Sequence, residues 1–197
     1  GVQTCALPIS EITLTADLES AISGADLVIF GIPSSFLRDT AKLAAPYLHA
    51  PMVIVNTGKG LEAGTHYTMS QILQEELPHL PIVTITGPSH AEEVARNVPT
   101  TVVAASKDLQ AAEYVQKTMS SETLRLYRNS DIIGCEVGGA LKNIIALSAG
   151  VCDGLGCGDN TKAALMTRGM HEITKLGVAM GGRSEERRVG KECRSRW

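Results

Sequence analysis

Short apolar segments alternate with helix-forming segments over the first 130 residues, and no other feature of the sequence constrains the fold as strongly. Each apolar run has the length of a strand and ends near glycine, proline or a polar residue. The strands predicted in this way are ADLVIFGIP (25–33), PMVIVNTGKG (51–60), PIVTITGPS (81–89), PTTVVAAS (99–106) and TLRLYRN (123–129). Helices are predicted at about 17–25, 35–48, 65–77 and 108–119, with a short one beginning at HAEEVARN. Ser34 and Ser35 are predicted to cap the helix at 35–48. This alternation predicts βαβ units and a mostly parallel sheet that is covered on both faces.

The pattern changes after Asp131, because no further strand is predicted up to residue 182. The segment DIIGCEVGGALKNIIALSAGVCDG indicates one long helix, and GLGCGDN indicates a turn between helices. A second helix is predicted at 160–180, with Asn160 or Thr161 as its N-cap. The sequence therefore predicts an α/β segment at 10–130 and the start of an all-α segment at 131–182.

The two ends of the chain fit neither segment. Residues 1–9, GVQTCALPI, resemble the translation of a sequencing-library adapter, and residues 183–197, RSEERRVGKECRSRW, resemble that of the opposite adapter. Such segments are excluded from fold reasoning. We therefore expect both ends to be artefacts and the protein's own sequence, from Ser10 to Gly182, to be truncated on both sides.

Charge and cysteine content narrow the functional classes. The formal net charge of −3 argues against nucleic acid or an anionic membrane as a partner. The absence of a run of about 18 apolar residues predicts no transmembrane helix. Between the two ends lie Cys135, Cys152 and Cys157, without a CxxC pair. This spacing predicts neither a metal site nor a disulfide framework, and it fits a reducing cytoplasm.

Ligands of parallel α/β sheets bind at the carboxyl ends of the strands, where this chain has the loops GIPSS, NTGKG and GPSHAEE. Lys59, between two glycines, is suited to reach a phosphate or polarise an oxygen, although a solvated loop lysine fits the same pattern. Gly87, Ser89 and the backbone amides of a helix start favour an anion, although a turn with an N-cap fits equally well. We interpret His90 as a residue of that helix start.

Lys142 lies in the apolar helix EVGGALKNIIALSAG, with Asn143 beside it. Its neighbours at helical spacing are mostly small residues: Gly138, Gly139, Ala146 and Ala149. A partly buried lysine with a lowered pKa is suited to accept a proton. A lysine that extends to solvent at the helix edge fits the same periodicity, so the residues alone leave both interpretations open.

Taken together, the motifs resemble the bacterial type of NAD(P)-dependent glycerol-3-phosphate dehydrogenase over essentially all of 10–182. The resemblance depends on the order of ADLVIFGIPSS, NTGKGLE, GPSHAEEVARNVPT and DIIGCEVGGALKNIIALSAGVCDGLGCGDNTKAALMTRG. It implies that 10–130 is a partial Rossmann-like NAD(P)-binding domain without its first strand and glycine loop. It also implies that 131–182 is a partial α-helical substrate domain.

The resemblance implies roles for six residues. Lys142 matches the proton acceptor, which also contacts the substrate, and Asn143 would support the substrate hydroxyl. Lys59 matches a residue that touches both the nicotinamide cofactor and the substrate. Gly87 and Ser89 match contacts with glycerol phosphate, Ala91 matches a cofactor contact, and no metal is implied.

The implied reaction is the reversible NAD(P)H-dependent reduction of dihydroxyacetone phosphate to sn-glycerol 3-phosphate, for glycerophospholipid synthesis. The implied partner is this small molecule, with no nucleic acid and no membrane, in the cytoplasm. A homodimer stays open as the assembly, and the choice between NADH and NADPH stays open as well. Because the glycine loop and a phosphate-binding arginine would lie outside the chain, we expect the 197-residue chain alone to be inactive.

Two rival interpretations remain. A related β-hydroxyacid dehydrogenase would pair its helix lysine with an asparagine four residues later, whereas position 146 is alanine and Asn143 is adjacent to Lys142. The other rival is a catalytically inactive fragment that only packs or binds a dinucleotide.

Overall fold

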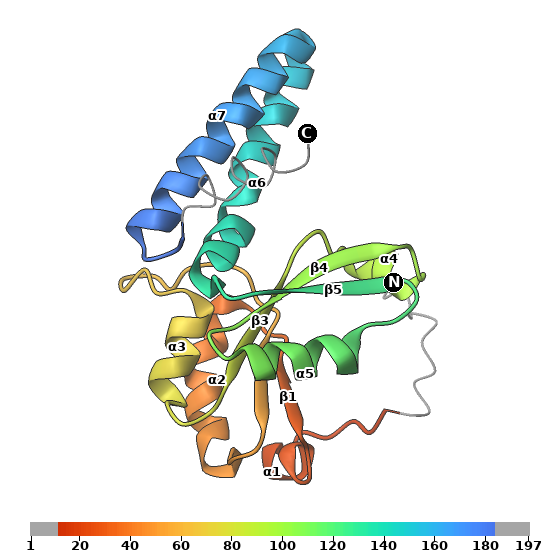
Figure 1. Ribbon diagram of the computed structural model, residues 1–197, viewed down its shortest axis with the longest axis vertical. Coiled ribbons are helices and arrows are strands. Elements are labelled where there is room, and N and C mark those ends of the chain that lie inside the picture. The colour runs from red at the N-terminus through yellow and green to blue at the C-terminus, as the bar shows by residue number, and fades with distance from the viewer. Residues whose placement is uncertain (1–11, 184–197) are drawn as a thin grey trace, which may run out of the picture. The chain divides into compact units, whose positions relative to one another are not determined.

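The computed structural model of the chain describes residues 12–183. The ends that the sequence indicates to be adapter-derived, 1–9 and all of 183–197 except Arg183, lie outside the described residues. Five strands and seven α-helices follow one another in the order that the alternating pattern predicts (Figure 1). The strands are β1 (Leu27–Phe30), β2 (Val53–Asn56), β3 (Ile82–Thr86), β4 (Thr100–Ala105) and β5 (Leu124–Asn129). The helices are α1 (Leu18–Ile22), α2 (Leu37–Ala44), α3 (Met69–Glu76), α4 (Ala91–Ala95), α5 (Leu109–Met119), α6 (Ile132–Gly154) and α7 (Gly158–Ala179).

The strands form a single mixed sheet in the order β1-β2-β3-β4-β5. Three of the four strand pairs are parallel, and only β3 and β4 are antiparallel, with Ile85 opposite Ala104. The connection from β3 to β4 contains only the five-residue helix α4, and β4 starts at the edge of the sheet where β3 ends. The prediction of a mostly parallel α/β sheet followed by helices is confirmed, and the antiparallel pair is the local exception.

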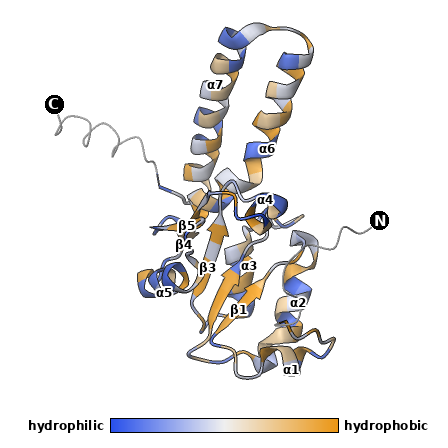
Figure 2. Cartoon of the chain, turned by 90° about the vertical axis from the view of Figure 1, so that its right-hand side faces the viewer, coloured by the Kyte–Doolittle hydropathy of each residue, from blue (hydrophilic) through white to orange (hydrophobic). Residues whose placement is uncertain are grey.

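Two hydrophobic cores cover the two faces of this sheet. One core joins α2 and α3 to residues such as Phe30 and Ile54. The other joins α5 to Val53, Val55 and Val83. Neighbouring residues of β2 thus belong to opposite cores, because side chains alternate along a strand. Figure 2 shows β1 and β3 mainly in orange, the colour of hydrophobic residues.

The predicted helix caps differ from those observed. Ser34 and Ser35 do not cap α2 but lie in a short 3-10 helix, Ser34–Phe36, that leads into it. Helix α7 begins two residues earlier than predicted, with Cys157 at its N-cap and no side-chain hydrogen bond to the helix, so Asn160 and Thr161 lie inside the helix. The positive φ of Gly158 (79°) lets the chain turn directly into α7 without a polar cap.

The chain separates into two compact units, one ending at Ile132 and the other beginning at Ile133. In the second unit, α6 and α7 approach each other closely where α7 carries glycine. A Cβ atom added to Gly169 would lie 2.3 Å from Cδ1 of Ile145, and one added to Gly177 would lie 3.8 Å from Cγ1 of Val137. Small residues therefore permit this helix pair.

Helix α6 is the one helix within 12–183 that is long and apolar enough to cross a membrane by length and composition. The prediction that the chain has no such helix is therefore qualified. It depended on the absence of an uninterrupted apolar run, and the apolar sequence of α6 is interrupted by Glu136, Lys142 and Asp153. This helix is weak evidence for a membrane span, because a core helix of a soluble protein passes the same test.

Candidate active site

The carboxyl ends of β1, β2 and β3 lie at one edge of the sheet, so the loops GIPSS, NTGKG and GPSHAEE begin next to one another. The backbone N–H of Thr57 donates to the carbonyl oxygen of Phe30 at 3.2 Å, and the Thr57 hydroxyl reaches the same oxygen at 3.4 Å. These bonds tie the start of the second loop to the end of β1. The edge that the sequence predicts as a binding site is therefore a connected structure.

Asn56, whose side chain is fully buried, forms hydrogen bonds to the loop that carries Lys59. The side-chain oxygen of Asn56 accepts from the N–H of Gly58 at 3.0 Å, and its amide donates to the carbonyl oxygen of Gly58, also at 3.0 Å. A Cβ on Gly58 would lie 3.1 Å from the carbonyl oxygen of Ile32, so glycine lets the first two loops approach closely. Asn56 had no assigned role, although a polar residue that ends a buried apolar strand is a readable signal.

Gly60 and Lys59 complete this second loop. Gly60 has a φ of 142°, and a Cβ there would lie 3.0 Å from the hydroxyl oxygen of Ser34. Lys59 itself is exposed. A glycine-flanked loop therefore carries an exposed lysine at the edge of the sheet.

The third loop also requires a glycine. Gly87 has a φ of 146°, and a Cβ there would lie 3.0 Å from Cα of Val102 on β4. Ser89 is half-buried, and its hydroxyl lies 3.5 Å from the carbonyl oxygen of Gly87. His90 is the N-cap residue of α4, which confirms its interpretation as a helix-start residue.

One hollow of about 560 Å³ brings part of the predicted site together. Ser89 and Ala91 from the third loop line it, together with Thr57 from the second. The rest of its wall is mainly apolar, with Ile85 and Val102 among its residues, whereas Lys59 and Gly87 are not part of its lining. The hollow thus joins an apolar wall to a few polar groups, as small-molecule sites commonly do.

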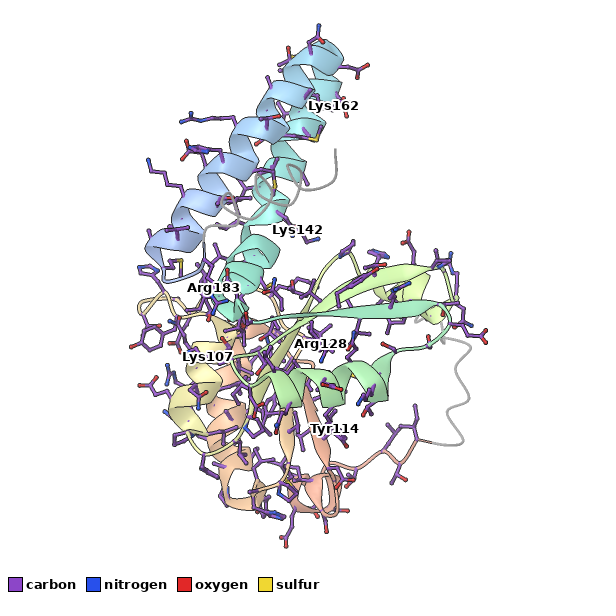
Figure 3. The ribbon with its side chains drawn as sticks, in the orientation of Figure 1. Lys107, Tyr114, Arg128, Lys142, Lys162 and Arg183 are labelled. Atoms are coloured by element: carbon purple, nitrogen blue, oxygen red, sulfur yellow. The ribbon has the colours of Figure 1, made fainter. Side chains whose placement is uncertain are left out.

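In the second unit, Lys142 lies on α6 (Figure 3) and is exposed, as is the adjacent Asn143. The interpretation of Lys142 as a proton acceptor, as far as it follows from periodicity, requires a partly buried side chain. Within the described residues this requirement is not met. A Cβ on Gly138, one helical turn before Lys142, would meet no atom within 4 Å. The helix surface at Gly138, on the same side as Lys142, is therefore open.

One arginine and three glutamates form a hydrogen-bonded cluster that includes the end of the Lys59 loop. The Nε and Nη2 atoms of Arg38 bind the two carboxylate oxygens of Glu62 at 2.7 and 2.8 Å, while Nη1 reaches Glu75 at 2.8 Å and Glu76 at 2.5 Å. The hydroxyl of Thr65 also donates to Glu62, at 2.5 Å. Hydrogen bonds from Arg38 and then from Thr65 lower the pKa of Glu62 to about 2. This cluster was not predicted, since it joins three segments that are distant in sequence.

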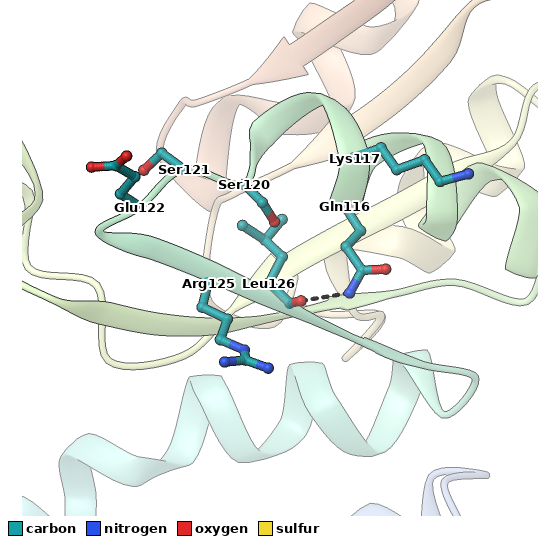
Figure 4. Close-up of a pocket in the computed structure, with 7 residues that line it drawn as sticks. All are labelled: Gln116, Lys117, Ser120, Ser121, Glu122, Arg125 and Leu126. Carbon is teal, nitrogen blue, oxygen red and sulfur yellow. Dashed lines mark hydrogen bonds between the residues drawn. The ribbon is translucent and has the colours of Figure 1, made fainter.

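A second hollow, of about 470 Å³, lies at the end of α5 and the start of β5 (Figure 4). Its lining includes Lys117, Glu122 and Arg125, and the Gln116 amide there donates to the carbonyl oxygen of Leu126 at 2.7 Å. None of the site residues predicted from the sequence lines this hollow. We therefore assign the candidate site to the loops at the carboxyl ends of β1, β2 and β3.

A mostly parallel sheet with glycine-containing loops at its carboxyl edge, followed by an all-helical segment, defines the class of α/β dehydrogenases that bind a nicotinamide dinucleotide. The model of the N-terminal domain of NAD-dependent glycerol-3-phosphate dehydrogenase matches residues 3–112, and that of the C-terminal domain matches residues 131–191. The chain belongs to the NAD-dependent glycerol-3-phosphate dehydrogenase family.

Individual relatives agree with this family. A glycerol-3-phosphate dehydrogenase [NAD(P)+] of Desulfitobacterium hafniense (strain Y51) is 58% identical over 158 residues, which are 80% of this chain and 45% of that protein. One of Moorella thermoacetica is 57% identical over 170 residues, 86% of this chain and 50% of that protein. The crystal structure of glycerol-3-phosphate dehydrogenase from Coxiella burnetii is similar with a TM-score of 0.78 and 35% identity, covering 86% of this chain and 52% of that one. The chain thus spans about half the length of the relatives it matches.

Proposed function

We propose that this chain is part of an enzyme that reversibly reduces dihydroxyacetone phosphate to sn-glycerol 3-phosphate with NADH or NADPH, for glycerophospholipid synthesis. The observation that carries the proposal is the 58% identity to a relative named for this activity. The motifs NTGKG, GPSH and GGALKN lie within the regions that match the family.

The loop geometry supports a cofactor site at the carboxyl edge of the sheet. Gly58, where a Cβ would lie 3.1 Å from the carbonyl oxygen of Ile32, lets the first two loops approach closely. Ala91 lines a hollow with an apolar wall, which suits a flat heteroaromatic ring. We propose Lys59 and Ala91 as the residues of this chain that hold the cofactor. The nicotinamide, when bound, supplies the hydride in reduction and takes it up in oxidation.

The remaining steps are assigned to side chains of this chain. Lys142 donates a proton to the substrate oxygen as it becomes an alkoxide and accepts it again in oxidation, while Asn143 supports the same hydroxyl. Lys59 places positive charge near that oxygen. Gly87 and Ser89 contact the glycerol phosphate, and the exposure of both lysines is compatible with contact to a ligand.

The proposal extends to the setting of the enzyme. We place it in the cytoplasm, with this small molecule rather than nucleic acid or a membrane as its partner and with a homodimer as the assembly to test. We also retain the proposal that 10–130 and 131–182 are the two partial domains.

A hybrid enzyme tests the proposed reaction. Residues 10–182 replace the matching stretch of the Desulfitobacterium hafniense relative, and the oxidation of NADH and NADPH is followed with dihydroxyacetone phosphate as substrate. We expect turnover by the hybrid, and a loss of about 10²- to 10⁴-fold in kcat for Lys142→Ala, because general acid–base catalysis contributes on this scale. Lys175→Ala, which removes an exposed lysine of α7, is the matched control and should retain activity within about twofold.

Two results would contradict the proposal. One is a folded hybrid that binds NAD(P)H but leaves dihydroxyacetone phosphate unreduced. The other is oxidation of 3-hydroxyisobutyrate in place of glycerol 3-phosphate, which would favour the β-hydroxyacid dehydrogenase interpretation. If Lys142→Ala keeps full turnover, its assignment as the proton acceptor is wrong.

A further inference from the structure

Two cysteines lie at the turn between α6 and α7. Cys152 is in the last turn of α6, and Cys157 is the N-cap residue of α7. The chain reverses between them through Gly156, which has a φ of 67°. The N–H of Cys157 donates to the carbonyl oxygen of Cys152 at 3.0 Å, and this bond closes the end of α6 as a glycine-containing C-cap does.

This turn brings the two cysteines close together. Their backbones are joined by the hydrogen bond across the helix end, and the Cys157 thiol lies near enough to Cys152 to raise the pKa of its thiol. A disulfide requires Cα atoms about 4.4–6.8 Å apart with their side chains directed toward each other. Because the backbone hydrogen bond already holds the two residues together, a bond between their thiols would join ends of α6 and α7 that are adjacent.

The two thiols differ in their surroundings. Cys157 is exposed, whereas Cys152 is half-buried. Burial raises the pKa of the Cys152 thiol, and Cys157 and Asp153 raise it further, while the nearby Lys162 opposes them. Lys162 lies 2.5 Å from the carboxylate of Asp153, so its charge is largely directed to that group. An oxidant from solvent therefore reaches Cys157 first.

We propose that Cys152 and Cys157 form a reversible redox site that a peroxide closes to a disulfide. Cys157 reacts with the peroxide, so that its thiol becomes a sulfenic acid while hydrogen peroxide is reduced to one molecule of water. The Cys152 sulfur then attacks the Cys157 sulfur, forming the S–S bond and releasing a second molecule of water. Two thiols are oxidised by two electrons, and a dithiol reductant returns both to the free form.

The closed form would pin the end of α6 to the start of α7. This site lies within the second unit and uses none of the residues assigned to catalysis, so it does not depend on the proposed function. Within 12–183 the three cysteines are free thiols, and only Cys152 and Cys157 lie together at a turn.

Peptide mapping of the 197-residue chain tests the proposal. The chain is treated with hydrogen peroxide, its free thiols are alkylated, and it is digested with trypsin without reduction. No lysine or arginine lies between Lys142 and Lys162, so one peptide, 143–162, carries both cysteines, while Cys135 lies in another. We expect peptide 143–162 to carry no alkyl group and to be about 2 Da lighter than the same peptide with two free thiols, because two hydrogen atoms are lost. Treatment with dithiothreitol should restore both thiols.

Single variants test the order of the two steps. In Cys152→Ser, the sulfenic acid of Cys157 has no partner and should be trapped by dimedone several-fold more than in the wild type. In Cys157→Ser, the half-buried Cys152 should remain largely unmodified, and Cys135→Ser should leave closure unchanged. The proposal is wrong if peptide 143–162 keeps both alkylated cysteines after peroxide treatment, if Cys157 is oxidised while Cys152 is still alkylated, or if Cys157 pairs with a second chain at any dilution.

Discussion

Gly87 shows how a single residue determines the shape of the candidate site. It combines a φ of 146°, which L side chains rarely adopt, with a space that a Cβ atom would fill to within 3.0 Å of Cα of Val102. The nearby atoms belong to the backbone and the base of a side chain, so they cannot rotate away. Both the conformation and the contact therefore require glycine at the end of β3.

We expect Gly87→Ala to reduce the free energy of unfolding by about 1–3 kcal/mol, because it adds backbone strain and a clash at one position. Gly31→Ala is the matched control at the same edge of the sheet, since a Cβ there would meet only the Thr57 hydroxyl at an ordinary 3.6 Å. It should change stability by no more than about 0.5 kcal/mol. Urea unfolding of the three chains measures both effects, and equal losses for the two variants would contradict this account.

At the scale of elements, the cluster around Arg38 joins α2, the Lys59 loop and α3. The guanidinium binds Glu62 with two parallel hydrogen bonds and reaches Glu75 and Glu76 with its remaining nitrogen. The side chains of Arg38 and Glu62 are only 22% and 19% exposed. This geometry distinguishes the cluster from isolated surface ion pairs, which contribute little.

We expect Arg38→Met to destabilise the first unit by about 1–2 kcal/mol at pH 7, since it removes charge-assisted hydrogen bonds to partly shielded carboxylates. The folded-state pKa of Glu62, about 2, lies below its ordinary value, so its contribution is fully present above about pH 4.5. That contribution decreases as the pH falls toward 2. Urea unfolding at pH 7 and pH 3 should therefore show a smaller difference between variant and wild type at pH 3. A difference that stays constant would mean that ionised Glu62 does not stabilise the fold.

Helices α6 and α7 depend on glycine at their closest approach. Gly169 is buried, and a Cβ there would overlap Ile145, lying 2.3 Å from Cδ1 and 2.9 Å from Cγ1. We expect Gly169→Ala to destabilise the helix pair by about 1–3 kcal/mol, despite the higher helix propensity of alanine, because the side chain of Ile145 must move. Helix content is followed by circular dichroism during urea unfolding.

The companion change Ile145→Val removes the atom nearest to the clash. The double variant should therefore lose less stability than the sum of the two single variants, with a coupling of about 0.5–2 kcal/mol. Additive losses would show that the two side chains do not meet. Gly150→Ala, where a Cβ would contact nothing within 4 Å, should be neutral or slightly stabilising.

At the scale of the whole molecule, the two units differ in how much apolar surface they bury. Both hydrophobic cores lie in the first unit, between Leu18 and Leu126. In α7 only Gly169 and Gly177 are buried, while large apolar side chains of the helix pair such as Leu147 and Leu155 are more than 70% exposed. The stability of the chain within 12–183 therefore comes mainly from the sheet and the helices that cover it.

A chain that ends at Ser130 should retain a cooperative thermal transition within a few degrees of that of the 197-residue chain, because both cores remain. A chain of residues 131–183 alone should be only partly helical at 25 °C, since two helices with few buried side chains are marginal in water. Calorimetry and circular dichroism of the two pieces make this comparison. Loss of the transition in the first piece would show that α6 and α7 are required for its fold.

Much of the architecture was predictable because burial leaves a periodic record in the sequence. The apolar run PMVIV is continuous, since both faces of β2 are covered, whereas the equally apolar ADLVIF forms the edge strand β1 and leaves Ile29 exposed. The loops at the carboxyl edge followed from the same pattern. The direction of β4 was not readable, because PTTVVAAS has the same composition as a strand of either direction.

The sequence by itself determined the class of the fold, the family, and the loops and helix in which the candidate residues lie, because these depend on local periodicity and on ordered motifs. Only the tertiary structure decided which distant groups meet. It bound the Asn56 side chain to the Lys59 loop, joined Arg38 to three glutamates, lined one hollow with Ser89 and Thr57, and joined the backbones of Cys152 and Cys157 at one turn. The physical reason is that hydrogen bonds, ion pairs and thiol contacts depend on distances of a few ångströms, and chain reversals set these distances without leaving a repeating pattern in the sequence.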